Sequence, residues 1–215
     1  MSAGTVILWR HGQTDYNAEG RLQGQIDIPL NDVGRAQAAL AAEQLALLEP
    51  AAIVSSDLSR AVETGRALGE LTGLDVTTDE RLRERSFGIW EGRTHTEMRA
   101  EWPDAFAQWR RGAHPEGIDA ESREELGERL VAAVGEIAGR YERSDTVVLV
   151  AHGAAIATGI TALLGQNPEG WRGIAGLGNC HWSTLQPYGG QPAWRLTGHN
   201  VGVPVRDFTS AGRIV

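Results

Sequence analysis

The sequence predicts an α/β fold with a mostly parallel central sheet. Short apolar runs of strand length occur at three places, and continuous runs of this kind are typical of strands that are covered on both faces. Stretches with helical spacing of apolar residues lie between them, and this alternation indicates a parallel sheet flanked by helices. The three runs are residues 5–9 (TVILW), 51–56 (AAIVSS) and 146–151 (TVVLVA).

The first strand, residues 5–9, is followed by a polar segment over residues 10–32. We interpret this segment as a loop, and a loop of that length in a compact domain is usually functional or mobile. Asn31 or Asp32 is expected to cap the next helix, which ends at Pro50. This helix carries apolar residues at helical intervals, namely Val33, Ala36, Leu40 and Leu47.

A second helix is predicted after the strand at residues 51–56. Asp57 is expected to cap it, and Gly73 is expected to end it. A short strand nearer the sheet edge is predicted at residues 75–78. The apolar face of the helix is made of Leu58, Ala61, Val62, Gly65 and Leu68.

The middle of the chain is predicted to leave the sheet. Residues 82–92 lack a clear periodicity and are expected to form a loop packed by Phe87 and Trp90. Residues 94–109 are helical, with a break at Pro103, and residues 110–120 form a Gly- and Pro-containing loop. We therefore expect residues 94–122 to form a cap-like excursion within a single domain that spans residues 1–215.

The last part of the chain completes the predicted sheet. The strand at residues 146–151 is expected to be central, and residues 154–164 to form a buried helix. Residues 182–186 and 194–197 are predicted as two late strands. The helix before the central strand has the clearest 3.6-residue pattern in the chain, with Leu126, Leu130, Ala133, Val134, Ile137 and Tyr141.

Composition excludes several classes of protein. Of the 215 residues, 41% are hydrophobic and 22% charged, and the net charge of −8 argues against nucleic acid or an anionic membrane as the main partner. Cys180 is the only cysteine, so neither an internal disulfide nor a thiolate metal cluster is expected. The sequence contains neither a signal peptide nor an apolar run of the ~20 residues that a membrane helix needs, which predicts a cytoplasmic protein.

Charged and catalytic residue types follow the predicted strands. Arg10 and His11 come after residues 5–9, His152 comes after the central strand, and Arg60 lies in the first turn of the helix after the second strand. Because open α/β sheets bind ligands at the carboxyl ends of their strands, these side chains are expected to converge. Arginine and histidine at such an edge suit a phosphate group.

Phosphoryl transfer is the chemistry that these residues favour. Neutral His11 can attack phosphorus, and Arg10, Arg60 and a protonated His152 can neutralise the phosphate oxygens. Glu84 is the candidate acid for the leaving alkoxide and the candidate base for the water that follows. Asn17 and Gln23 offer amide donors, and the scheme requires no metal and no cofactor.

Each assignment has a structural alternative. The arginines could form surface ion pairs, and His11 and His152 could be core histidines with satisfied hydrogen bonds. Their shared position at predicted strand ends favours the functional interpretation, because charges there would otherwise need partners. Glu80 and Glu91 remain alternatives to Glu84, because all three lie in the same region of the chain.

These motifs resemble the histidine phosphatase superfamily, in its phosphoglycerate mutase-like branch. The resemblance implies a three-layer αβα sandwich, a phosphorylated His11 and a proton donor at Glu84. It also implies that Arg10, Arg60 and His152 bind phosphate, and that Asn17, Gln23, Gly24 and Gly153 contribute to substrate binding. The matching segments are 10–17 (RHGQTDYN), 23–24, 27 with 29–30, 55–58 with 60–61, 82–84, 90–92 and 151–153.

Within the superfamily, the chain is most similar to glucosyl-3-phosphoglycerate phosphatases. The similarity lies in residues 10–25, SSDLSRA at residues 55–61, and Gly178-Asn179 followed by Trp182. It implies a metal-independent phosphomonoesterase that converts glucosyl-3-phosphoglycerate to glucosylglycerate. The alternatives are a broad phosphatase of small phosphorylated metabolites, a phosphoglycerate mutase and a non-catalytic binding protein. An exposed edge among the late strands is expected to allow a homodimer.

Overall fold

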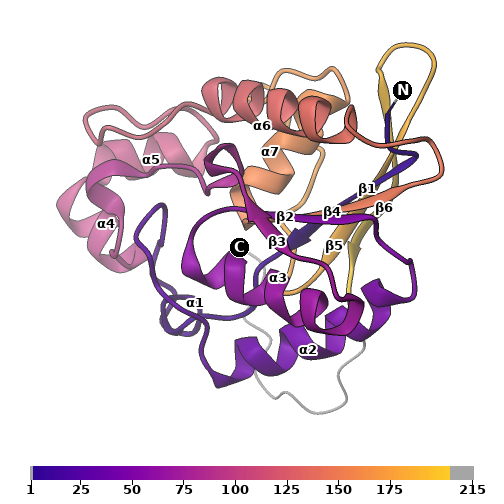
Figure 1. The fold of residues 1–215 in the computed structure, drawn as a ribbon. Coiled ribbons are helices and arrows are strands. Elements are labelled where there is room, and N and C mark those ends of the chain that lie inside the picture. The colour runs from indigo at the N-terminus through magenta and orange to yellow at the C-terminus, as the bar shows by residue number, and fades with distance from the viewer. Residues whose placement is uncertain (1, 204–215) are drawn as a thin grey trace.

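A six-stranded mixed sheet forms the middle of the molecule, in the order β3-β2-β4-β1-β5-β6 (Figure 1). The computed structural model describes residues 2–203. The four strands from β3 to β1 pair in parallel, whereas β5 runs antiparallel to β1 and β6 antiparallel to β5. The strands are β1 (Thr5–Arg10), β2 (Ala52–Ser55), β3 (Val76–Thr78), β4 (Thr146–Ala151), β5 (Trp182–Pro187) and β6 (Trp194–Val201). The mostly parallel sheet and the central place of β4 are as predicted.

Helices cover both faces of this sheet. α2 and α3 lie on one face and α6 and α7 on the other, whereas α4 and α5 lie to one side, towards which β1 points (Figure 1). The helices are α1 (Asp15–Glu19), α2 (Asp32–Ala46), α3 (Ser59–Thr72), α4 (His95–Glu101), α5 (Pro103–Arg110), α6 (Arg123–Ala138) and α7 (Gly153–Leu163). Two single 3₁₀ turns, Glu80–Leu82 and Gly88–Trp90, lie between β3 and α4.

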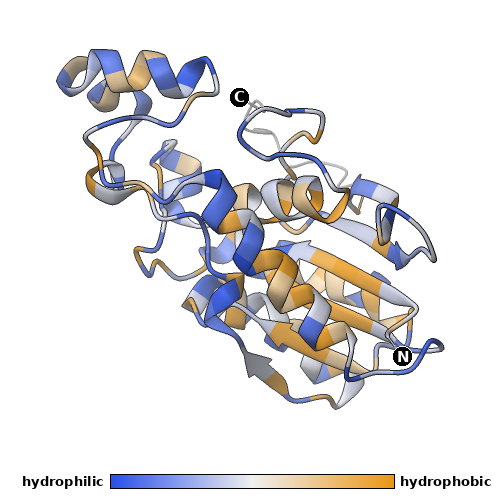
Figure 2. Cartoon of the chain, turned by 90° about the horizontal axis from the view of Figure 1, so that it is seen from above, coloured by the Kyte–Doolittle hydropathy of each residue, from blue (hydrophilic) through white to orange (hydrophobic). Residues whose placement is uncertain are grey.

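Successive side chains of a strand point to opposite faces of the sheet, and the interior therefore has two hydrophobic cores. Val6 and Leu8 of β1 pack with apolar residues of α6 and α7, and Ile7 and Trp9 pack with those of α2 and α3. This follows from the period of two along a strand, which sends successive side chains to opposite faces. Apolar residues therefore gather in the strands at the middle of the molecule (Figure 2). The three-layer αβα architecture is confirmed.

A third, smaller core joins the segment after β3 to the helices α4 and α5. Phe87 and Trp90 are buried there, as predicted, beside Met98 and Ala105. The break between α4 and α5 falls at Trp102, directly before Pro103, because proline has no N–H to continue a helix but fits its first turn.

The predicted face of α2 is wrong. Ala36 is exposed, and Leu47 lies just past the helix with 75% of its surface exposed. The buried residues are instead Gly34, Ala38, Ala41, Ala42 and Leu45. Alanine fits either side of a helix, so an Ala-rich helix has little hydrophobic contrast from which a face can be predicted.

The predicted cap of α3 is also wrong. Asp57 forms an ion pair with Arg83, and the Ser59 N–H at the start of α3 donates to Asp27 Oδ1 at 2.8 Å. Asp27, which is distant in the sequence, thus caps α3 in place of the adjacent Asp57. Two further differences are the short α1 within the predicted loop 10–32, and β6, which continues four residues beyond the predicted end at Thr197.

Two glycines allow the first loop to lie directly on α2. A Cβ on Gly12 would lie 2.4 Å from the carbonyl oxygen of Gly34, and a Cβ on Gly34 would lie 2.0 Å from the carbonyl oxygen of Gln13. Backbone cannot give way as a flexible side chain can, so any larger residue must push α2 and the loop apart.

Replacing Gly34 by alanine should therefore destabilise the protein by about 1–3 kcal/mol, the usual cost of overpacking. Gly135→Ala is the matched control, because Gly135 lies in α6, where an added Cβ would meet no heavy atom within 4 Å. This control should gain about 0.5–1 kcal/mol from alanine's helix preference. Urea unfolding measures both values, and a Gly34→Ala variant as stable as the control would contradict the close contact.

Candidate active site

His11 lies directly after β1 and is 2% exposed. Its Nδ1 lies 2.7 Å from the carbonyl oxygen of Gly12, which can only accept, so Nδ1 carries the proton. In the neutral ring, the other nitrogen, Nε2, therefore keeps its lone pair. This is the tautomer that an attacking imidazole requires.

The backbone around His11 is held from two sides. The Gly12 N–H donates to Thr64 Oγ1 of α3 at 3.0 Å, and the same hydroxyl donates to the Arg60 carbonyl at 2.7 Å. The His11 carbonyl accepts from the Cys180 N–H at 3.2 Å and from Asn179 Nδ2 at 3.1 Å. The imidazole thus projects from a backbone whose hydrogen bonds tie β1 to α3 and to the segment before β5.

His152 follows β4 and is fully buried beside His11, with ring centroids 5.0 Å apart. Arg60 Nε donates to His152 Nδ1 at 3.3 Å, so this nitrogen carries no proton. The Nε2–H of the neutral ring then donates to Ser56 Oγ at 2.9 Å. Sequence analysis did not assign a role to Ser56, although its position directly after β2 was a signal for one.

The two arginines place positive charge at the same edge of the sheet. Arg60, fully buried, donates to the carbonyls of Gly24 and Ile26, each at 2.8 Å. Arg10 donates to the Leu177 carbonyl, and its buried Nε has no hydrogen-bond partner. Within residues 2–203, neither arginine forms an ion pair with a carboxylate. Carboxylates, Glu84 foremost, act on both guanidinium groups only from a distance, so the site holds positive charge without a direct counter-ion.

This charge and the burial set the protonation of both histidines. Burial, followed by repulsion from Arg60, lowers the pKa of His11 and of His152 well below 6.5. Burial also lowers the pKa of Arg60 to about 10, which leaves it charged at neutral pH. The lowered pKa favours a neutral His152 in the unliganded protein, whereas the expected protonated His152 concerns the transition state and stays a prediction.

Glu84 reaches the same place from the loop after β3. Its Oε2 accepts from the Ala154 N–H at 3.0 Å, and its Oε1 accepts from the Ala155 N–H at 2.8 Å. The carboxylate thus meets the N-terminal N–H groups of α7, where helices attract negative charge. His152 precedes this helix without a side-chain cap of its own.

The two alternative glutamates lie elsewhere. Glu80 is exposed on a 3₁₀ turn, and Glu91 Oε1 accepts the N–H groups of Gln25 and Phe87, each at 3.0 Å. Glu91 thus joins the first loop to the segment after β3. Of the three candidates, only Glu84 contacts the helix that follows His152.

The amide candidates form one network in the first loop. Thr14 Oγ1 donates to Gln23 Oε1 at 2.9 Å, and Asn17 Oδ1 accepts from the Thr14 N–H at 3.1 Å and from Asn179 Nδ2 at 3.2 Å. Asn179 thus touches both His11 and Asn17, although sequence analysis gave it no role. The Gly178-Asn179 motif of the resemblance was the one signal for it, and that motif did not indicate which residues Asn179 contacts.

Gly24 and Gly153 are places of close approach. Gly24 has φ +54°, and a Cβ there would lie 2.1 Å from Glu91 Oε1. A Cβ on Gly153 would lie 3.3 Å from Arg10 Nε. Glycine therefore lets the first loop fold over Arg60, and lets α7 begin directly beside the Arg10 guanidinium.

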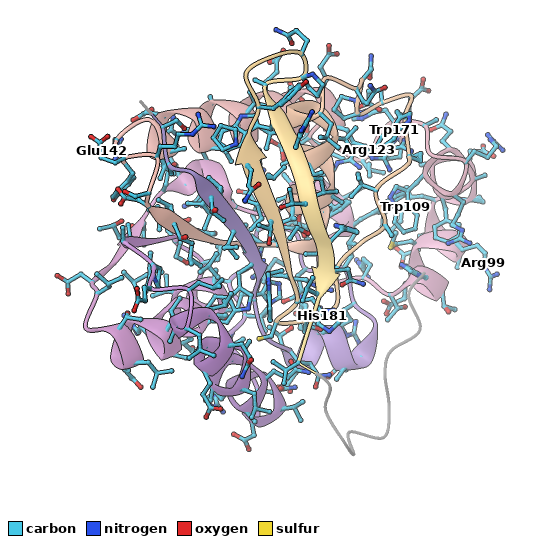
Figure 3. The ribbon with its side chains drawn as sticks, turned by 90° about the vertical axis from the view of Figure 1, so that its right-hand side faces the viewer. Arg99, Trp109, Arg123, Glu142, Trp171 and His181 are labelled. Atoms are coloured by element: carbon cyan, nitrogen blue, oxygen red, sulfur yellow. The ribbon has the colours of Figure 1, made fainter. Side chains whose placement is uncertain are left out.

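The remaining histidines take part in other contacts. His181 Nδ1 lies 2.8 Å from Asn200 Oδ1, and His95 packs against Trp109. Figure 3 shows His181 beside the late strands, and Trp109, which belongs to α5, away from His181. Within the described part of the chain, no three His, Cys, Asp or Glu side chains lie together in a way that could hold a metal ion. None of the helices in residues 2–203 is long and apolar enough to cross a membrane.

Comparison with known proteins identifies the family. The family "Histidine phosphatase superfamily (branch 1)" matches this chain over residues 6–200. A glucosyl-3-phosphoglycerate phosphatase from Mycolicibacterium vanbaalenii is 41% identical over 95% of this chain and 98% of its own. A probable phosphoglycerate mutase from Yersinia enterocolitica is 36% identical over 84% of this chain and 83% of its own.

The fold agrees with that of a solved relative. The structure of a mycobacterial glucosyl-3-phosphoglycerate phosphatase with VO3 matches with a TM-score of 0.85 and 41% identity, over 93% of this chain and all of the other. The chain therefore belongs to branch 1 of the histidine phosphatase superfamily.

Proposed function

We propose that the protein hydrolyses phosphate monoesters of small metabolites through a phosphohistidine at His11, with no metal ion in the reaction. The observation that carries this proposal is the state of His11. Its Nδ1–H donates to the Gly12 carbonyl, and its Nε2 lone pair is free beside Arg10 and Arg60, neither of which forms a direct ion pair with a carboxylate of residues 2–203. Neutral nucleophile and cationic surroundings are what attack on a phosphate dianion needs.

The reaction has two steps. In the first, Nε2 of His11 bonds to phosphorus while the ester P–O bond breaks, and protonated Glu84 gives its proton to the leaving alkoxide. In the second, water attacks phosphorus, the P–N bond breaks with its electron pair returning to Nε2, and the Glu84 carboxylate takes the proton from water. Arg10 and Arg60 stabilise the charge on the phosphoryl oxygens in both transition states.

One oxygen of Glu84 suits this proton transfer. Oε1 already accepts two N–H groups, those of Arg85 and Ala155, each at 2.8 Å. Oε2 accepts only that of Ala154 and so keeps an acceptor position. We propose that Oε2 carries the proton to the leaving group.

Glucosyl-3-phosphoglycerate is the substrate that we propose. The relative from Mycolicibacterium vanbaalenii, which is 41% identical, is named as a phosphatase of this compound. A pocket of about 310 Å³ lies beside α5, and although none of the catalytic candidates lines it, the chemistry of its lining suits a sugar and a second anionic group. Trp109 and Arg123 line it and lie on the same side of the molecule (Figure 3), together with Arg110, Arg111 and Arg172. An aromatic ring suits the apolar side of a sugar, and guanidinium groups suit a carboxylate.

Two further expectations stay predictions. One is a cytoplasmic location. The other is a homodimer formed through the outer edge of β6, which is the last strand on its side of the sheet.

His11→Ala should abolish phosphate release, to less than about a hundredth of the wild-type rate, because both ring nitrogens of His152, the histidine beside it, are engaged in hydrogen bonds. Rapid acid-free quenching of the wild type with substrate should trap a phosphoprotein that is labile in acid and stable in base. Circular dichroism confirms that the variant is folded. A folded variant that keeps more activity than this would exclude covalent catalysis by His11.

The pH profile should follow the lowered pKa of His11. The imidazole stays neutral as the pH falls through its usual value of about 6.5, and attack is lost only when Nε2 takes a proton at a lower pH. After correction for ionisation of the substrate, kcat/KM should therefore not fall between pH 7 and pH 6. An acid limb that is centred at or above pH 6.5, and that remains when each of the other histidines is replaced in turn, would contradict this.

Substrate preference is measured by competition. We expect a higher kcat/KM for glucosyl-3-phosphoglycerate than for 3-phosphoglycerate or simple sugar phosphates, because remote contacts raise this ratio only if they tighten in the transition state. Comparable values for all three would leave a broad metabolite phosphatase. Conversion of 3-phosphoglycerate to its 2-phospho isomer, without phosphate release, would instead identify a mutase.

A further inference from the structure

The guanidinium of Arg129, on α6, donates hydrogen bonds to the backbone of the segment that leads to Glu84. Its Nη1 donates to the carbonyls of Arg81 and Arg83, at 2.7 and 2.8 Å, and its Nη2 donates to the Glu84 carbonyl at 3.0 Å. Its remaining N–H groups bind a carboxylate, Nε to Glu121 Oε1 at 2.6 Å and Nη2 to Glu121 Oε2 at 2.9 Å. The five donors of the guanidinium are thereby all used.

Glu121 holds the same segment from its far end. Its Oε2 accepts from the Ser86 N–H at 3.1 Å, and its backbone N–H donates to the Ser86 carbonyl at 3.0 Å. Its own carbonyl accepts from the Nε of Arg85 at 2.7 Å. The segment 81–86 is thus bound on both sides of Glu84 by one ion pair, Arg129–Glu121.

This ion pair is unlike an ordinary surface pair. The side chains of Arg129 and Glu121 are only 19% and 16% exposed, and both are bonded to backbone as well as to each other. A two-pronged arginine–carboxylate contact fixes direction as well as distance. By contrast, the pair between Arg81 and Glu136 joins two side chains that are 32% and 52% exposed.

The segment needs such a support because of where Glu84 must reach. Its carboxylate spans the gap from the loop after β3 to the first N–H groups of α7. Apart from Arg129, its carbonyl accepts only from Gln25 Nε2, at 3.1 Å, and Gln25 belongs to the irregular first loop. A rigid anchor on α6 therefore decides where the backbone of Glu84 lies relative to α7.

We propose that Arg129 and Glu121 are positioning residues for the proton transfer by Glu84. This inference rests on the proposed role of Glu84 as the acid. The ion pair acts through the backbone of residues 81–86, touches neither substrate nor His11, and holds the Glu84 carboxyl group at the place where the leaving oxygen develops charge. Small displacements of an acid are costly because proton transfer requires hydrogen-bond distance.

The test compares two esters that differ in their need for an acid. An alkyl phosphate requires protonation of its leaving oxygen, whereas an aryl phosphate with an acidic phenol departs without it. Glu84→Gln, Arg129→Lys, Glu121→Gln and the double variant Glu84→Gln/Arg129→Lys are measured on both esters. Arg129→Lys keeps the charge but not the fork that binds three carbonyls. Glu121→Gln is the milder change, which guards against a variant that does not fold.

We expect Glu84→Gln to slow the alkyl ester by about 100-fold and the aryl ester by less than about 5-fold, within the usual range for a general acid. Arg129→Lys and Glu121→Gln should slow the alkyl ester by about 10-fold and the aryl ester by less than about 3-fold. In the Glu84→Gln background, Arg129→Lys should change the alkyl rate by no more than about 2-fold, because the group that it positions is already lost.

Arg81→Gln is the matched control, since Arg81 forms ion pairs on the same segment with Asp79 and Glu136 but its side chain does not contact Glu84. It should leave both rates within about 2-fold. Equal slowing of the two esters by Arg129→Lys and Glu121→Gln, or a full effect of Arg129→Lys in the Glu84→Gln background, would overturn the proposal. Equal slowing of both esters by Glu84→Gln alone would instead refute the acid role. The double variant would then still decide whether Arg129 acts through Glu84.

Discussion

Positive charge without a direct counter-ion, at the carboxyl ends of β1, β2 and β4, is the constraint on which the rest of the site depends. Arg60 is fully buried and Arg10 has a buried Nε without a partner, yet no carboxylate pairs with either within residues 2–203. Burial of a charge is costly unless it is paired. Backbone carbonyls of Gly24, Ile26 and Leu177 provide partial compensation, and they leave the net charge in place. Such a site is arranged for an anion that arrives with the substrate.

The neighbouring groups follow from that charge. Burial first, and then repulsion from Arg60, lowers the pKa of His11 and of His152, so burial and the arginines together keep the His11 lone pair available. The Glu84 carboxylate is bound by the N–H groups of α7, and the Glu84 carbonyl is held by Arg129. The chain is thus a histidine phosphatase in which backbone hydrogen bonds keep the proposed nucleophile His11, the two arginines and the Glu84 carboxylate apart.

Sequence patterns predicted what depends on neighbours along the chain. Apolar runs gave the strands of the parallel sheet, and strand ends followed by Arg10-His11 and by His152 indicated where side chains converge. What failed depends on distant partners. Asp57 lies next to α3, but Arg83 takes its carboxylate and Asp27 caps the helix from 32 residues away. Arg129 has no motif, and the motif that contains Asn179 does not indicate its partners, because the contacts with the backbone of Glu84 and with His11 come from the packing of separate segments. The face of α2 failed because alanines on both sides give no hydrophobic contrast.

The central claim is that Arg10 serves anion binding and not the stability of the free protein. Arg10→Met retains a side chain of similar reach without the charge, and vanadate is a phosphate-like anion that should occupy the site. The measurement is thermal unfolding of wild type and variant, with and without vanadate. The account predicts that free Arg10→Met is at least as stable as the wild type, while vanadate stabilises the wild type and no longer stabilises the variant. A free variant that is less stable by more than about 2 kcal/mol, yet still stabilised by vanadate as strongly as the wild type, would contradict it.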